Sequence, residues 1–455
     1  MTSTANGNEL PGAKARWIVN AVGFWCALGY ACLAFLAKQP GEPDLPVFFI
    51  LVAWTGLPVF GLYHYFRSRG EPFPVGRMFF WAVVFRICGL IGGPFFEDDF
   101  NRYLWDGYRF ATIGTPYGAA PEAFFADPGV PASFQRLLDG INNPELPTIY
   151  APTTQVVFLL GYWLQPGSVA ALQLILILVD LVTIALLLRM APARGVMLYA
   201  WCPLVIKEIA FTAHPDGVGV CLLLAAILFS RNRRWRYASL CLGMAAGAKF
   251  FALAMFPLVL ARARARHWIL FGATLAALYT PFIIRGGTEL ASLLVFAREW
   301  QFNSALFGVL ATVLRPFEAK LVLGLMYFAF WAIYAIKFVR SSTHPAPRGD
   351  WLYGALLVIS PVINPWYLLW LLPFAAIFPS AWAWTASASV LLSYVTGLNL
   401  NDYGLQPYQQ PAWARLLEFG LILPALVYDL SRRRLRRLGG GNDLGGNACT
   451  SCIKT

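Results

Sequence analysis

Charged residues are scarce in this chain of 455 residues, and this scarcity excludes a soluble protein. Asp, Glu, Lys and Arg together make up 13% of the sequence, whereas hydrophobic residues make up 58%. A soluble domain carries about 25% charged residues. The composition therefore predicts a polytopic membrane protein. The 17 tryptophans fit this class, because indole rings anchor helices at bilayer interfaces.

Histidine and cysteine are too few and too scattered to predict a metal centre. The histidines form no H-E-x-x-H or similar motif; they are His64, His214, His267 and His344. Six of the eight cysteines lie in apolar segments, where they are expected to be packing residues. The other two, Cys449 and Cys452, form a lone C-x-x-C in a glycine-rich tail, which is a weak metal or redox signal.

Nucleotide-binding motifs are also missing from the sequence. It contains no P-loop, no G-x-G-x-x-G and no G-x-S-x-G. A membrane enzyme without a nucleotide site would take its activated group from a lipid. The net charge of +12 does not indicate nucleic acid, because much of the excess lies in short loops between apolar segments and in the tail. Basic loops of this kind are typical of the cytoplasmic side.

Apolar runs of about 17–25 residues, and some slightly shorter ones, predict an all-α bundle over residues 17–430. The segments expected to cross are residues 17–37, 46–66, 78–93, 169–190, 195–210, 216–230, 267–284, 320–338, 381–398 and 411–430. Both terminal tails, 1–16 and 431–455, are predicted to be cytoplasmic, and the basic, glycine-rich second tail to be disordered. Arg86 lies inside a predicted span, so we expect it to be functional or to have an acidic partner.

Three apolar segments are predicted not to cross. Residues 150–164 are read as a half-helix, because crossing would place the next basic loop outside. Residues 237–260 lie between two basic loops and break near Lys249, so two short helices with Lys249 at their outward tip are expected. Residues 351–363 and 366–379 are a similar pair. Residues 286–319 are expected to stay outside or to dip back.

Residues 94–149 form a predicted outer loop, in which short helices are expected to lie on the membrane with aromatic rings at the interface. Residues 97–107 read Glu-Asp-Asp-Phe-Asn-Arg-Tyr-Leu-Trp-Asp-Gly. Asp98, Arg102 and Asp106 are spaced to share one helical face. A carboxylate beside guanidinium groups would have a low pKa and would suit a base near a phosphate. The alternative is that these acids only cap a helix.

Most polar breaks fall on the predicted outer side, so we expect an outward-facing polar cavity with acids at its rim and cations at its base. These residues are Asp98, Asp99, Arg102, His214, Asp216, Lys249, Arg285, Arg298, Asn303 and Asn364. Structural alternatives stay open. His214 to Asp216 is also a turn and cap signal, Lys249 is also able to snorkel, and Asn364 to Tyr367 is also a helix stop.

Residues 97–107, followed by Gly-Thr-Pro-Tyr at 114–117, resemble the signature of bacterial GT-C glycosyltransferases that use polyprenol-phosphate sugars, many of them mannosyltransferase-like. Weaker similarities follow at 147–152, 199–216, 248–250 and 364–370, so the resemblance covers most of residues 80–375. Ala151, Cys202 and Pro215 stand where the family has Pro, Asn and Asn.

The resemblance implies a GT-C-type bundle that transfers a hexose, most often mannose, with inversion from a polyprenyl-phosphate donor to a lipid or glycan acceptor. It implies Asp98 as general base, with Asp99 as the alternative. Lys249, with Arg102 or Arg285, is expected to bind the donor phosphate. The remaining expected cavity residues are Glu97, Trp105, Asp106, Tyr117, Tyr150, His214, Asp216, Asn303, Asn364, Trp366 and Tyr367.

The expected location is the inner (plasma) membrane, with the active site on the extracytoplasmic face and membrane lipids as neighbours. A divalent cation, Mg or Mn, at the acid cluster is left open, because adjacent carboxylates define no ligand geometry. The alternative function is a transporter or flippase for a lipid-linked sugar, since broken helices and a midplane cation also suit transport.

Overall fold

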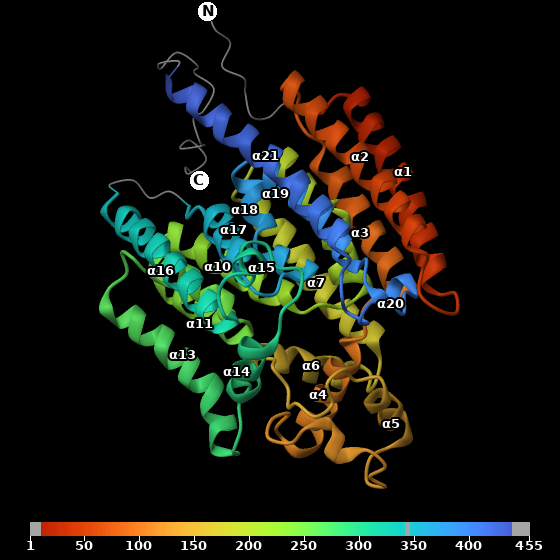
Figure 1. Cartoon of the computed structure of the whole chain (residues 1–455). Coiled ribbons are helices and arrows are strands. Elements are labelled where there is room, and N and C mark those ends of the chain that lie inside the picture. The colour runs from red at the N-terminus through yellow and green to blue at the C-terminus, as the bar shows by residue number, and fades with distance from the viewer. Residues whose placement is uncertain (1–10, 342–345, 439–455) are drawn as a thin grey trace, which may run out of the picture.

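The computed structural model describes residues 11–341 and 346–438, and this part of the chain is helical, with one isolated β-bridge between Phe302 and Val362 and no named strand. Six of its helices are long and apolar enough to cross a membrane: α1 (Ala13–Ala37), α2 (Leu45–Arg69), α3 (Val75–Gly92), α7 (Val169–Leu188), α13 (Ala265–Ile284) and α16 (Pro316–Arg340). The chain is therefore a helical multi-pass membrane protein, as its composition predicts (Figure 1).

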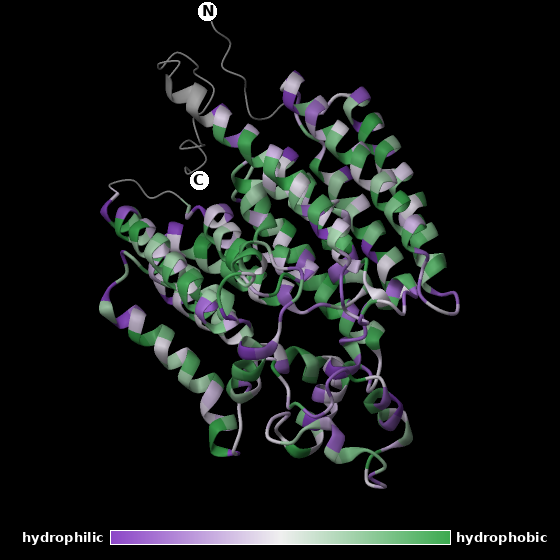
Figure 2. Ribbon diagram, viewed as in Figure 1, coloured by the Kyte–Doolittle hydropathy of each residue, from purple (hydrophilic) through white to green (hydrophobic). Residues whose placement is uncertain are grey.

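The surface of the bundle carries many exposed apolar side chains. On α16, Leu321, Leu325 and Phe328 are more than half exposed, and on α13 Ile269 and Ile284 are too. Hydrophobic residues cover these outward faces (Figure 2). Soluble monomers rarely expose apolar patches of this extent, and lipid chains are the solvent that such faces require.

The predicted outer loop folds as a small helical layer of its own. Its elements are α4 (Phe100–Ile113), η1 (Pro121–Phe124) and α5 (Ala132–Asp139). This layer lies at the opposite end of the molecule from the end of α21 (Ala412–Leu438) (Figure 1). Its aromatic residues correct one expectation: Trp105, Tyr108 and Phe134 pack into a core inside the loop rather than spreading over an interface.

Several short helices confirm the predicted breaks. α6 (Pro152–Leu164) has 13 residues, about 20 Å at 1.5 Å per residue, which does not cross a hydrocarbon core of about 30 Å. α11 (Trp235–Ala248) ends before Lys249, whose backbone is extended, and η3 (Phe250–Met255) with α12 (Phe256–Val259) follows. α17 (Gly349–Ile359) is likewise separated from η4 (Pro365–Trp370) and α18 (Leu372–Ile377) by a non-helical stretch.

Two predicted spans, residues 195–210 and 381–398, are broken rather than continuous, and the second is divided among three short helices. The first consists of α8 (Ala193–Ala200), α9 (Pro203–Ile206) and the π-helical turn η2 (Lys207–Phe211). The helix stops before Pro203 because proline has no N–H and disfavours a helical residue before it. Pro203–Phe211 then meets α10 (Asp216–Arg231) at an angle of 116°.

The last part of the chain completes the bundle. Residues 286–319 hold α14 (Leu290–Glu299) and α15 (Leu306–Leu310), and residues 381–400 hold α19 (Ala381–Ser389), η5 (Val390–Tyr394) and α20 (Gly397–Leu400). The first basic residues of the predicted disordered tail continue α21 to Leu438. The rest of that tail, with Cys449 and Cys452, and residues 1–10 lie outside the described residues.

The expected acidic partner of Arg86 is Asp180 on α7. The Arg86 Nε donates to Asp180 Oδ2 at 2.6 Å, and the Tyr199 hydroxyl donates to Asp180 Oδ1 at 2.7 Å. Arg86 Nη1 also donates to the carbonyls of Ala82 and Ala200 at 2.9 Å. Both charged side chains are fully buried, so one buried polar cluster joins α3, α7 and α8.

The substitution Asp180→Asn is expected to lower the free energy of unfolding by about 3–5 kcal/mol, because it leaves a buried guanidinium unpaired. Chemical unfolding in detergent micelles measures this loss. The control is Glu71→Gln, which breaks the exposed pair of Arg69 and Glu71 at 3.6 Å and should change stability by about 0–1 kcal/mol. Equal midpoints for Asp180→Asn and wild type would contradict the assigned role of the pair.

Candidate active site

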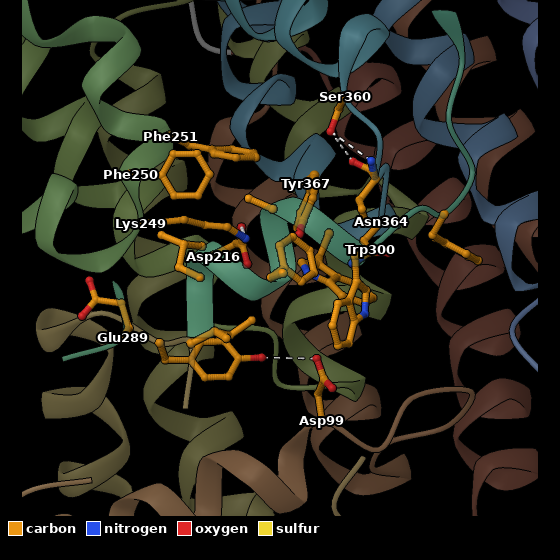
Figure 3. A pocket seen from close by; sticks show the side chains of 18 of the residues that line it. Asp99, Asp216, Lys249, Phe250, Phe251, Glu289, Trp300, Ser360, Asn364 and Tyr367 are labelled. Carbon is orange, nitrogen blue, oxygen red and sulfur yellow. Dashed lines mark hydrogen bonds and ion pairs between the residues drawn. The ribbon is translucent and has the colours of Figure 1, made fainter. Parts of the chain in front are cut away.

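A cavity of about 1320 Å³ lies between the outer loop layer and the ends of the broken helices. Asp98 and Asp99 line it from the start of α4, Asp216 from the start of α10, and Lys249 from the end of α11. In Figure 3, Lys249 and Asp216 lie together on one side, and Asp99 lies across the cavity from them. The expected meeting of carboxylates and an ammonium group in one pocket is thus present.

Asp99 faces the cavity instead of capping α4. It occupies the N-cap position, but its side chain accepts no capping hydrogen bond. The hydroxyls of Tyr150 and Tyr103 donate to Asp99 Oδ2 at 3.3 and 3.4 Å, and the His214 Nε2 lies 4.0 Å from the same oxygen. The Asp99 side chain is 31% exposed, so it is accessible to a molecule in the cavity. The two tyrosine hydroxyls fix its orientation.

Asp98 has different surroundings. Its Oδ1 accepts a hydrogen bond from the Asn142 amide, and Tyr408 donates to Asn142 Oδ1 at 3.0 Å. Burial, followed by repulsion from Asp99, raises the pKa of Asp98 to about 6. The sequence-based expectation of a low pKa is therefore wrong for Asp98. The physical reason is that Asp98 precedes α4, so it does not share a helical face with Arg102.

Arg102 lines the cavity, but its guanidinium holds the outer loop in place. It donates to the carbonyl oxygens of Leu146 at 2.8 Å, Asn143 at 3.0 Å and Asn142 at 3.3 Å. These bonds satisfy the carbonyls that precede the Pro-Thr-Ile-Tyr stretch. Arg102 therefore shapes the rim of the cavity, and most of its donors are already used.

Lys249 and Asp216 form an ion pair at the inner end of the cavity. Lys249 Nζ lies 2.6 Å from Asp216 Oδ1, and the Trp370 indole donates to the same oxygen at 2.8 Å. The ammonium group also lies 4.2 Å from the centre of the Tyr367 ring. Trp370 reaches Asp216 across Gly219, where an added Cβ would come within 2.6 Å of the indole.

A buried charged cluster lies behind Asp99. His214 Nδ1 is 3.0 Å from Glu208 Oε2, and the Tyr394 hydroxyl donates to Glu208 Oε1 at 2.8 Å. Lys207 Nζ is 3.4 Å from Glu208 and also contacts the Tyr394 hydroxyl. Trp366 stacks on the His214 ring with centroids 3.9 Å apart.

Three members of this cluster were missed from the sequence: Lys207, Glu208 and Tyr394. A usable signal existed for two of them, because Lys207 and Glu208 are adjacent charges inside an apolar segment, and intramembrane charges are functional by default. Nothing in the sequence connects Tyr394, which lies 186 positions after Glu208, to this pair.

Five expected cavity residues lie elsewhere. Trp105 belongs to the core of the loop layer, and buried Asp106 accepts hydrogen bonds from Thr148 at 2.5 Å and Gln155 at 2.8 Å. Tyr117 donates to the Tyr150 carbonyl at 2.8 Å, and Asn303 donates to Glu418 at 3.1 Å. His214 is wholly buried behind Trp366. Each of these side chains packs or forms hydrogen bonds inside the fold and does not line the cavity.

Arg285 is also outside the cavity. It is exposed and donates to the carbonyl of Gly114, the left-handed residue that ends α4. Of the residues expected to line the site, Glu97, Tyr150, Asn364, Trp366 and Tyr367 do contact the cavity. Over residues 11–341 and 346–438, no group of three or more His, Cys, Asp or Glu is placed to hold a metal ion.

Comparisons with known proteins add no identification. No family model matches the chain, no curated protein matches it, and no solved structure matches it.

The raised pKa of Asp98 predicts a pH dependence of stability. A folded-state pKa of about 6 against an ordinary 3.8 means that the folded protein retains a proton longer than the unfolded chain. The stability from Asp98 is therefore present below about pH 4 and is lost as the pH rises through about 6. Asp98→Asn should flatten this part of the profile of melting temperature against pH.

The matched control for this profile is Asp139→Asn, an exposed carboxylate at the end of α5. It should keep the wild-type slope between pH 4 and pH 7. Burial also raises the pKa of Asp106 to about 6, so part of the slope should remain in Asp98→Asn. A slope as steep as that of wild type would contradict the assignment to Asp98.

Proposed function

We propose that this protein is an integral-membrane glycosyltransferase. It moves a hexose, with mannose favoured by the sequence resemblance, from a polyprenyl-phosphate donor to a hydroxyl of a lipid or glycan acceptor. The observation that carries the proposal is one cavity that combines an ammonium group, two adjacent carboxylates and a long apolar wall. Polyprenyl-phosphate sugars present the matching set: an anion, a sugar and a hydrocarbon chain.

The apolar wall supports a lipid donor. Leu253, Leu275, Leu293, Leu294 and Leu323 line the cavity beside α13, α14 and α16. These helices also carry exposed apolar faces, so a prenyl chain bound along this wall would lie close to the surrounding hydrocarbon. The transfer of buried methylenes contributes about 0.8 kcal/mol each.

Lys249 supports binding of the phosphate. An ammonium group has three N–H donors. Asp216 and the Tyr367 ring contact the ammonium group of Lys249, and these two contacts leave part of it open. Its side chain is 21% exposed and faces the cavity. Lys249 is thus able to donate to a phosphate oxygen and to stabilise the charge that develops when the phosphate leaves.

The carboxylates support an in-line displacement. One of the two, Asp98 or Asp99, removes the proton of the acceptor hydroxyl, and the oxygen attacks the anomeric carbon as the bond to the phosphate oxygen breaks. The polyprenyl phosphate leaves with the electron pair, and the configuration of the anomeric carbon inverts. The acceptor would approach from the outer loop layer, opposite Lys249. The proposed reaction therefore takes place on the side of the outer loop layer, which the sequence predicts to be the extracytoplasmic face.

The test is transfer by the purified protein in liposomes from a panel of polyprenyl-phosphate sugars to lipid and glycan acceptors. Wild type should give product with an inverted anomeric configuration. Replacing the base, by Asp99→Asn or Asp98→Asn, should lower kcat by about 10³-fold while donor binding persists. Asp139→Asn is the control and should leave kcat unchanged.

Two results would contradict this function. Wild-type transfer rates in both Asp98→Asn and Asp99→Asn would exclude carboxylate catalysis here. Movement of intact lipid-linked sugar across the bilayer without any transfer product would indicate the transporter alternative.

Lys249→Gln should raise the donor KM by about 10- to 100-fold, which corresponds to about 1.4–2.7 kcal/mol of lost phosphate binding. Steady-state kinetics over a range of donor concentrations measures this shift. Lys337→Gln, on an exposed position of α16, is the matched control. An unchanged KM and kcat in Lys249→Gln would exclude a role for Lys249 with the donor.

A further inference from the structure

The two candidate base residues, Asp98 and Asp99, differ in the side chains that neighbour them. Asp98 is held by the Asn142 amide, which is a neutral hydrogen-bond donor. Asp99 faces an imidazole: His214 Nε2 lies 4.0 Å from Asp99 Oδ2. This Nε2 is buried and has no hydrogen-bond partner among the described residues. A buried polar atom without a partner destabilises the folded state, so its retention calls for an explanation.

The other side of the imidazole fixes which nitrogen carries the hydrogen. Glu208 Oε2 lies 3.0 Å from Nδ1, and an ionised carboxylate only accepts hydrogen bonds. The Thr212 hydroxyl lies 3.1 Å from Nδ1 and is also within reach of the backbone carbonyls of Lys207 and Glu208. Nδ1 is therefore the N–H donor, which leaves Nε2 of the neutral ring with a free lone pair directed towards Asp99.

The backbone around His214 is built to hold this orientation. Ala213 has a φ of 59°, a left-handed conformation that residues with a side chain rarely adopt. The His214 N–H donates to the Glu208 carbonyl at 2.8 Å, and Trp366 stacks on the ring from the cavity side. Strained backbone of this kind persists where the surrounding structure determines it, and it gathers at functional sites.

The remaining polar groups around the ring come from three elements and the stretch before α4. Lys207 and Glu208 lie on η2, Tyr394 on η5 and Tyr103 on α4, whereas Asp99 and Glu97 lie just before α4. Lys207 lies 3.4 Å from Glu208 and offsets its charge. A positive charge on His214 would therefore be met by Glu208 on one side and by Asp99 on the other.

We propose that His214 is a positioning residue that makes Asp99 the base of the proposed transfer, by taking up the proton that Asp99 removes from the acceptor hydroxyl. Glu208 holds the imidazole in the tautomer that this role needs. The inference rests on the proposed glycosyl transfer and names which of its two carboxylates reacts.

The proton balance is simple. The acceptor O–H bond breaks, its electron pair forms the new bond to the anomeric carbon, and the pair of the old glycosyl–oxygen bond leaves with the phosphate. The proton moves to Asp99 Oδ2 and then to His214 Nε2, after these two atoms close by about 1 Å to hydrogen-bond distance. Asp99 is then ionised again, and the proton leaves His214 through Asp99 to the cavity before the next turnover.

The test uses the full-length protein in liposomes with a polyprenyl-phosphate sugar that the wild type turns over. His214→Gln should lower kcat by about 100-fold and leave the donor KM within about twofold, because the imidazole does not touch the donor. Glu208→Gln should lower kcat by about tenfold, and Glu208→Asp should restore part of this loss. The double variant should be no slower than His214→Gln, since both residues act through one proton path.

The pH profile separates this role from a merely structural one. In wild type, kcat should fall on the acid side. Glu208→Gln should shift this fall along the pH axis, because Glu208 contacts the Nδ1 edge of the imidazole, and His214→Gln should abolish it. A structural defect would lower kcat by the same factor at every pH.

Two buried residues away from the cavity provide matched controls. His267→Gln on α13 and Glu418→Gln on α21 replace the same side-chain types in buried positions, and they should keep the wild-type kcat and pH profile. Elution from a size-exclusion column reports whether each variant folds. Should His214→Gln not fold, Glu208→Gln and Glu208→Asp decide, since both keep the imidazole and its stack on Trp366.

The outcomes are distinguishable. Absence of transfer by wild type with every donor would refute the proposed function itself. Active wild type together with a wild-type kcat and pH profile in Glu208→Gln or His214→Gln would overturn the relay alone. Loss of activity in Asp98→Asn but not in Asp99→Asn would also overturn it, because the relay serves only Asp99.

Discussion

The ion pair between Lys249 and Asp216 is the contact on which the arrangement of the site depends. Asp216 is the first residue of α10, and Lys249 follows the last residue of α11. A carboxylate at a helix N-terminus and an ammonium group at a helix C-terminus both complement the helix dipole. The pair therefore stabilises two helix ends that stop inside the bundle, and Trp370 links it to η4. Without such contacts, helix ends at membrane depth would leave polar groups unsatisfied.

The same requirement explains why most charges in the bundle occur in clusters. Arg86 is paired with Asp180, and Lys207 is paired with Glu208. Removing charges from water costs several kcal/mol per ion, and only close partners offset that cost. The cluster at Lys207 and Glu208 differs from the pair at Arg86 in one respect: it extends through His214 to within 4.0 Å of a carboxylate that lines the cavity. Burial alone thus does not distinguish these two clusters, whereas the distance to a carboxylate that lines the cavity does.

The two neighbouring carboxylates show that adjacent residues in the sequence can have different partners in the folded structure. Asp98 and Asp99 are adjacent, yet Asp98 is held by the Asn142 amide, whereas Asp99 accepts from two tyrosines and faces an imidazole at 4.0 Å. The cavity that they share has an apolar wall on the side of α13 and α16. A proposal of transfer from a polyprenyl-phosphate sugar brings these features together: the lipid chain in the wall, the phosphate at Lys249 and the acceptor at the acids.

The sequence by itself determined the class of the protein and some of its helix breaks, such as the one near Lys249, but not the break inside residues 195–210. Low charge and long apolar runs require a helical membrane bundle, and the basic loops on both sides of residues 237–260 require a turn near Lys249, because these signals act over short stretches of chain. The tertiary structure alone decided which polar residues share the cavity. Asp106, Asn303 and Arg285 are bound elsewhere, and Glu208 reaches Tyr394 across 186 positions. The packing of distant helices selects such partners, and no local pattern records that packing.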